Sequence, residues 1–179
     1  MQLEFKRFDQ ELLDNTKTEW ERQILEHKDE VYAPQFQQKL DWAEKRLHDD
    51  TGTLHVYAVT DVDQGGHAVA IIELNHAMPK SSDAWLKMMS MTVQPCYDIS
   101  VGKADNSDLA RIAGKSISES YGLIFADHPS ATLKVIGNNS ISIEFLKYIA
   151  TTLQDIKIKA YTQGQWLVIE KCDPNLLTR

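Results

Sequence analysis

Glu73 is the acidic residue of this sequence best placed for acid–base chemistry. It shares one face of an alternating apolar run with Val69 and Ile71. A carboxylate on such a face points into a core or a ligand gap, where desolvation can raise its pKa and let it take a proton from an amine. The structural alternative is a strand end at which Glu73 pairs with a lysine or arginine, and both interpretations stay open.

A second group of residues suits an anionic ligand. Trp85–Val93 is a mostly apolar run that predicts a buried strand, and Pro95 ends it. A long amphipathic stretch, which predicts a helix, runs from Ser107 to Asp127. Free N–H groups and the positive end of the helix dipole favour an anion at such a helix start. The loop between strand and helix offers three residues that can cradle a phosphate group: Gly102, Lys103 and Ala104.

The rest of the chain supplies the elements that must hold these residues. Apolar residues recur at helical spacing in stretches that begin near Gln10, Pro34, Ser107 and Ile141. Alternating or continuous apolar runs predict the strands between and around them. The resulting order, β–α–α–β–β–β–α–β–α–β–β, predicts an α/β (α+β) fold with a mixed, mostly antiparallel sheet of about six to seven strands flanked by four helices. The short strand Thr132–Ile136 is expected to lie parallel to its neighbour, after a crossover helix.

Length and composition limit the classes of protein to consider. The 179 residues fit a single domain, residues 1–179, because no repeat or linker marks a boundary. No apolar run reaches the length of a membrane span, and two distant cysteines favour a reduced, cytoplasmic setting. The net charge is −7, and residues 1–50 account for −5 of it with 8 basic and 13 acidic residues. Without a basic patch, we expect no nucleic-acid partner. Without an apolar run of membrane-span length, we expect no membrane partner.

The element order resembles that of the GNAT acyltransferase superfamily, and three short segments are similar to family motifs. Met91–Pro95 resembles the V-x-P end of the fourth strand, and Val135–Asn139 resembles a fifth strand that ends in asparagine. Phe145–Tyr148 resembles an aromatic segment of the last helix. The likeness covers nearly the whole chain and lies more in topology than in motifs.

The resemblance implies a co-substrate, acetyl-coenzyme A or another acyl-coenzyme A. It implies that backbone groups of Met91 and Val93 bind the pantetheine amides, where the fourth and fifth strands separate. It also implies that Asn139 belongs to the coenzyme site. The loop that contains Gly102 would then wrap the pyrophosphate.

Two features depart from the family pattern. The pyrophosphate loop has one glycine where the family usually has two or more, and Asp98 stands near the family's basic or glutamine position. The family's catalytic tyrosine falls on Phe145 or Leu146, and neither can donate a proton. Tyr148, one turn further along the helix, is the remaining candidate for a proton donor. Its structural alternative is an aromatic residue on the helix face, with its hydroxyl at the rim.

Three functions follow as hypotheses. The first is transfer of an acyl group from coenzyme A to an unidentified amine. The second is a GNAT-like protein that binds acyl-coenzyme A or another small ligand without efficient transfer, and the third is a small-molecule binder unrelated to coenzyme A. The acidic N-terminal helices would suit a cationic amine. A homodimer through a terminal strand or its hairpin is expected, because Trp166–Ile169 is nearly continuously apolar.

Overall fold

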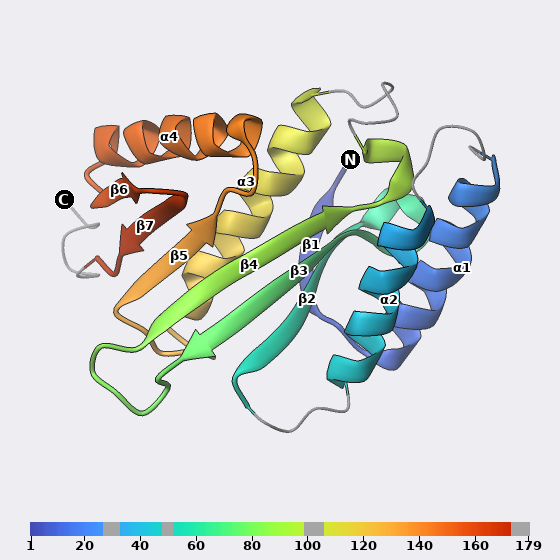
Figure 1. Cartoon of the computed structure of the whole chain (residues 1–179), viewed down its shortest axis with the longest axis horizontal. Helices are drawn as coiled ribbons and strands as arrows, with labels where there is room; N and C mark the ends of the chain where they lie inside the picture. Colours follow the sequence, from blue (N-terminus) through green and yellow to red (C-terminus); the bar gives the residue numbers. More distant parts are fainter. Residues whose placement is uncertain (27–32, 48–51, 99–105, 173–179) are drawn as a thin grey trace. The chain divides into compact units, whose positions relative to one another are not determined.

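The computed structural model describes residues 1–26, 33–47, 52–98 and 106–172. In chain order its elements, with η marking short 3₁₀ helices, are β1 (Leu3–Arg7), α1 (Gln10–Glu26), α2 (Ala33–Leu47), β2 (Leu54–Asp61), η1 (Val62–Gln64), β3 (Ala68–Ala77), β4 (Trp85–Val93), η2 (Pro95–Tyr97), α3 (Asn106–Leu123), β5 (Thr132–Ile136), α4 (Ser140–Asp155), β6 (Ala160–Gln163) and β7 (Trp166–Glu170) (Figure 1). This order of strands and α-helices confirms the one predicted from the sequence.

The strands form one seven-stranded sheet in the order β1-β2-β3-β4-β5-β7-β6. The β1–β2, β5–β7 and β6–β7 ladders are antiparallel, whereas β4 and β5 run parallel. The predicted fold class, a mixed and mostly antiparallel sheet with four α-helices, is therefore confirmed for the described residues. The parallel ladder runs from Trp85↔Thr132 to Met88↔Val135, and β4 continues beyond its last pair to Val93.

The chain divides into two compact units. The first comprises Met1–Glu73 and Ser90–Ser116, and the second comprises Leu74–Met89 and Ile117–Arg179. The predicted single domain of residues 1–179 stays a prediction.

The core of the first unit forms where the apolar stripes of α1 and α2 meet β2 and β3. Trp20 and Phe36, one from each helix, are fully buried and stack edge to face with ring centroids 5.8 Å apart. The Trp20 indole N–H donates a 2.8 Å hydrogen bond to the backbone carbonyl of Ala68. Figure 1 shows α1 and α2 side by side, as this contact requires. The spacing that predicted the helices thus also orients them.

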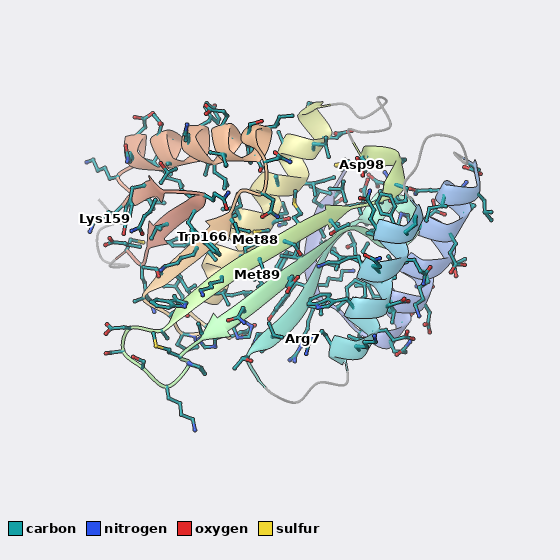
Figure 2. The ribbon with its side chains drawn as sticks, viewed as in Figure 1. Arg7, Met88, Met89, Asp98, Lys159 and Trp166 are labelled. Atoms are coloured by element: carbon teal, nitrogen blue, oxygen red, sulfur yellow. The ribbon has the colours of Figure 1, made fainter. Side chains whose placement is uncertain are left out.

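In the second unit, β7 lies between β5 and β6. Its central residues Leu167, Val168 and Ile169 are buried, because neighbouring strands and α4 surround them. Trp166 begins this strand, while Met88 and Met89 occupy successive positions of β4, the first buried and the second partly exposed (Figure 2).

The apolar run Trp166–Ile169 has a different cause from the one the sequence suggested. It reflects the inner position of β7 in the sheet rather than an exposed edge, which β6 forms instead. The apolar run therefore no longer supports the predicted homodimer, which stays a prediction. Separately, none of the described helices combines the length and apolarity needed to cross a bilayer.

Candidate functional site

Glu73, Ser90 and Lys39 form a closed hydrogen-bonded triangle within the first unit. The Ser90 hydroxyl donates to Glu73 Oε2 at 3.0 Å, and the Lys39 ammonium donates to the same oxygen at 3.2 Å. Lys39 Nζ also donates to Ser90 Oγ at 2.7 Å. Glu73 comes from β3, Ser90 from β4 and Lys39 from α2, so each of these three elements contributes one side chain.

The triangle is largely shielded from water. The side chain of Lys39 is 11 % exposed and that of Glu73 is 24 % exposed. Burial lowers the pKa of the Lys39 ammonium, and the attraction of the Glu73 carboxylate offsets part of this effect. The Lys39 Nζ atom also lies 4.0 Å from the centre of the Trp42 ring, one turn along α2. A cation over an aromatic face is stabilised by the quadrupole of the ring.

The Glu73 carboxylate keeps one oxygen for another donor. Both of its hydrogen bonds end on Oε2, and no other described residue donates to Oε1. A partly buried carboxylate with one free oxygen can accept a proton from a ligand. The structure therefore shows the lysine pairing that the sequence left open as the structural alternative, and the role of Glu73 as a base stays a prediction.

The predicted backbone positions Met91 and Val93 follow Ser90 directly along β4 and are partly exposed. Gln94, which is fully buried, fixes the end of this strand through a 2.9 Å bond from its backbone N–H to the carbonyl of Val69. The structure thus brings Glu73, Met91 and Val93 into one unit. The predicted phosphate-binding residues lie outside the described residues: Gly102, Lys103 and Ala104.

A buried polar network holds the turn that follows β4. His67 Nε2 lies 3.0 Å from the side-chain oxygen of Gln94, and the backbone N–H of Cys96 donates to the side-chain oxygen of Gln23 at 3.1 Å. Burial raises the pKa of the Cys96 thiol, which keeps it protonated at neutral pH. These contacts anchor the strand end to α1 and give Cys96 a packing role rather than a nucleophilic one.

Asn139 and Tyr148 belong to the second unit. Asn139 caps α4: its side-chain oxygen accepts a 2.8 Å bond from the backbone N–H of Ser142, and the Ser142 hydroxyl accepts one from the Asn139 N–H at 3.1 Å. This reciprocal pair is a capping box. Tyr148 lies on α4 with 68 % of its surface exposed. The capping contacts give Asn139 a structural role. Its predicted role in coenzyme binding and the predicted role of Tyr148 as a proton donor stay predictions.

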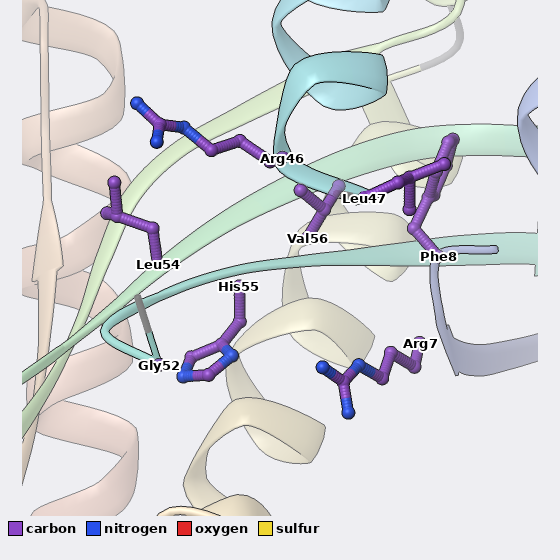
Figure 3. Close-up of a pocket in the computed structure, with 8 residues that line it drawn as sticks. All are labelled: Arg7, Phe8, Arg46, Leu47, Gly52, Leu54, His55 and Val56. Atoms are coloured by element: carbon purple, nitrogen blue, oxygen red, sulfur yellow. The ribbon is translucent and has the colours of Figure 1, made fainter. Parts of the chain in front are cut away.

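A cleft of about 270 Å³ opens elsewhere in the first unit, near the start of β2 (Figure 3). Its lining combines cationic and apolar side chains: Arg7, Phe8, Arg46, Leu47, Gly52, Leu54, His55 and Val56. Successive strand residues point to opposite faces, so His55 and Val56 face opposite sides of the sheet. The cleft therefore lies at the beginning of β2 and is lined by residues from both faces of this strand. Glu73, Ser90 and Lys39 do not line it.

Sequence reasoning found Glu73 but missed its partners, Lys39 and Ser90. One signal was present, because Glu73 and Ser90 are polar residues in apolar strands and buried polar groups need hydrogen-bond partners. Lys39 gave no such signal, since it only flanks the apolar stripe of α2.

No model of a known protein family matches the sequence, and no curated protein matches it either. The solved structures do give likenesses. An acetyl transferase from Salmonella typhimurium, described as modifying the N-terminal serine of a 50S ribosomal subunit protein, superposes with a TM-score of 0.50 at 9% sequence identity. That likeness covers 97% of this chain and 96% of the other. The chain has the GNAT fold.

Two further structures are similar at lower scores. An acetyltransferase of the GNAT family from Staphylococcus aureus has a TM-score of 0.46 and 8% identity, over 94% of this chain and 98% of that one. A chimera of the spermidine N-acetyltransferase SpeG from Vibrio cholerae with hSSAT also has a TM-score of 0.46, with 11% identity over 95% and 93% of the chains.

Proposed function

We propose that this GNAT-fold protein transfers an acyl group from an acyl-coenzyme A to an amine, with Glu73 as the base. The observation that carries the proposal is the Glu73–Ser90 hydrogen bond. It holds a carboxylate beside β4, one residue before Met91, where the GNAT resemblance expects the pantetheine to lie. Acetyl-coenzyme A is the donor that the solved acetyltransferases suggest, and the amine is unidentified.

The proposed reaction requires only one proton transfer to a side chain of this site. Glu73 Oε1 would take a proton from the bound ammonium, and the neutral amine would then attack the thioester carbonyl. Holding the two reactants in line, with backbone N–H groups near the developing oxyanion, would supply most of the rate. A carboxylate that also attracts cations suits an amine that arrives protonated.

One observation favours a second candidate, a GNAT-fold protein that binds acyl-coenzyme A or another small ligand without efficient transfer. Lys39 already neutralises Glu73 at 3.2 Å, so the carboxylate is less available to an external ammonium than an unpaired one would be. In this candidate the triangle is a structural ion pair.

A thiol-release assay with acetyl-coenzyme A and a panel of primary amines separates the two candidates. We expect release of coenzyme A that depends on the amine, and we expect Glu73→Gln to lower kcat/KM by roughly 10²- to 10⁴-fold, the usual worth of a general base. Glu44→Gln is the matched control, because Glu44 also pairs with a lysine, Lys17, at a distance of 2.9 Å. This pair is not part of the Glu73–Ser90–Lys39 triangle. A Glu73→Gln enzyme with the parent's rate would remove Glu73 from catalysis. Coenzyme binding without any release would favour the second candidate.

A further inference from the structure

The side-chain amine of Lys39 already occupies the place that the proposed reaction requires of its acceptor. An acceptor nitrogen must lie within hydrogen-bond reach of the base. Lys39 Nζ lies 3.2 Å from Glu73 Oε2 and 2.7 Å from the Ser90 hydroxyl, which itself donates to that carboxylate. Among the described lysines, no other bonds to Glu73 or Ser90.

Burial makes the Lys39 ammonium easier to deprotonate. It lowers the pKa of the group, since water no longer solvates the charge fully, and the Glu73 carboxylate offsets part of this effect. Glu73 can receive the proton directly, or through Ser90 acting as a relay. The side chain still keeps 11 % of its surface exposed.

We propose that Lys39 is an acyl acceptor within the protein itself, acylated on Nζ by the acyl-coenzyme A of the proposed function, on which this inference rests for its donor. The Lys39 ammonium gives one proton to Glu73, and the Nζ lone pair attacks the thioester carbonyl carbon. The amide C–N bond forms as the C–S bond breaks. Coenzyme A leaves as a thiolate and takes up the second proton lost by the nitrogen, while Glu73 passes its own proton to water.

Acylation would change the site that it modifies. The amide carries no charge, so the ion pair between Lys39 and Glu73 disappears, and only hydrogen bonds from neutral groups, such as the Ser90 hydroxyl, remain to Oε2. The carboxylate would then be available to an external ammonium. Self-acylation would thus relieve the neutralisation of Glu73 by Lys39.

Lys17 offers a matched internal control. It lies on α1, is also partly buried with 24 % of its side chain exposed, and also pairs with a glutamate, Glu44 at 2.9 Å. It lacks a hydroxyl partner and a facing aromatic ring among the described residues. A difference in reactivity between Lys39 and Lys17 therefore reports the triangle rather than partial burial or ion pairing in general.

The test incubates the full chain with acetyl-coenzyme A and, separately, with p-nitrophenyl acetate, and follows acetylation of each lysine by peptide mass spectrometry. We expect Lys39 to react at least about tenfold faster than Lys17, because Lys39 has both a carboxylate and a hydroxyl group within hydrogen-bond reach. Glu73→Gln should remove this preference. Ser90→Ala should reduce it, and provides a second variant if Glu73→Gln does not fold.

The use of two acetyl donors distinguishes failure of Lys39 as the acceptor from failure of coenzyme A as the donor. Preferential acetylation of Lys39 by p-nitrophenyl acetate alone would support Lys39 as the acceptor and count against coenzyme A as the donor. Preferential acetylation by acetyl-coenzyme A would support both. If neither donor acetylates Lys39 faster than Lys17, or if the preference persists in both variants, the inference is overturned.

Discussion

Glu73 receives two hydrogen bonds on one oxygen, and its pairing with Lys39 limits how it can act. A half-buried carboxylate and a buried ammonium stabilise each other only while both are present, because removing one leaves the other charged and poorly solvated. The Ser90 hydroxyl links them and fixes the direction of the carboxylate. The same three contacts therefore serve the fold and define the site.

Glu19 gives a residue-scale prediction about pH. Hydrogen bonding from Arg22 is the largest cause that lowers the pKa of Glu19, to about 2 from 4.5, and Gln23 adds a further donor. A carboxyl whose folded pKa is depressed stabilises the protein above its unfolded pKa, and this stabilisation is lost as pH falls through the folded value. We expect Glu19→Gln to lower the free energy of unfolding at neutral pH, with the difference shrinking between pH 4.5 and about 2.

Urea unfolding of the parent and of Glu19→Gln across this pH range measures the effect. A difference between the two proteins that stays constant down to the acid end would contradict the assignment to the Arg22 hydrogen bond.

At the scale of elements, periodicity was enough to place most of the fold. Trp85–Val93 and Thr132–Ile136 were predicted as strands and are strands with those bounds. The helix predicted from Ser107 to Asp127 instead ends at Leu123. Its apolar pattern continues because the following turn keeps i to i+3 bonds, such as the 3.1 Å bond from the Phe125 N–H to the Gly122 carbonyl. A helical pattern cannot show where α-helical bonding gives way to such a turn.

The candidate site was less predictable than the fold. Glu73 could be found because a carboxylate interrupts an apolar strand. Its pairing with Lys39 depends on how α2 lies against β3, and that packing is not encoded in the spacing of either segment alone. The inner position of β7 was missed although a continuous apolar run is typical of a strand buried on both faces, because such a run does not show which strands lie beside it.

Asn139 gives a prediction at the scale of one helix. Its side chain caps α4 through the bond to the Ser142 N–H, so Asn139→Ala should lower the free energy of unfolding by about 1 kcal/mol, within a usual range of roughly 0.5–2 kcal/mol. Asn139→Asp is the matched control, because aspartate caps helices equally well. Thermal and urea unfolding check both variants. Unchanged stability in Asn139→Ala would show that the cap contributes nothing.

At the scale of the whole molecule, charge argues against long-range attraction of the donor. The chain has a net charge of −7, and coenzyme A carries several negative phosphate charges. Binding must therefore depend on local groups, such as backbone N–H groups of β4 and of the glycine-containing loop. Gly102, the only glycine of that loop, is the residue for which positive φ is free of a Cβ penalty.

The account depends most directly on whether the full chain binds acetyl-coenzyme A, and isothermal titration calorimetry measures this. We expect saturable binding at one site, weakened more by Gly102→Val than by Lys103→Ala, because a side chain at Gly102 would exclude several N–H contacts whereas a partly solvated lysine contributes about 1 kcal/mol or less. Both variants should melt, without ligand, at the parent's temperature, because the sequence predicts a loop at these two positions and loop substitutions usually leave the core intact. Parent protein that shows neither heat of binding nor a thermal shift at millimolar acetyl-coenzyme A would contradict the proposed function.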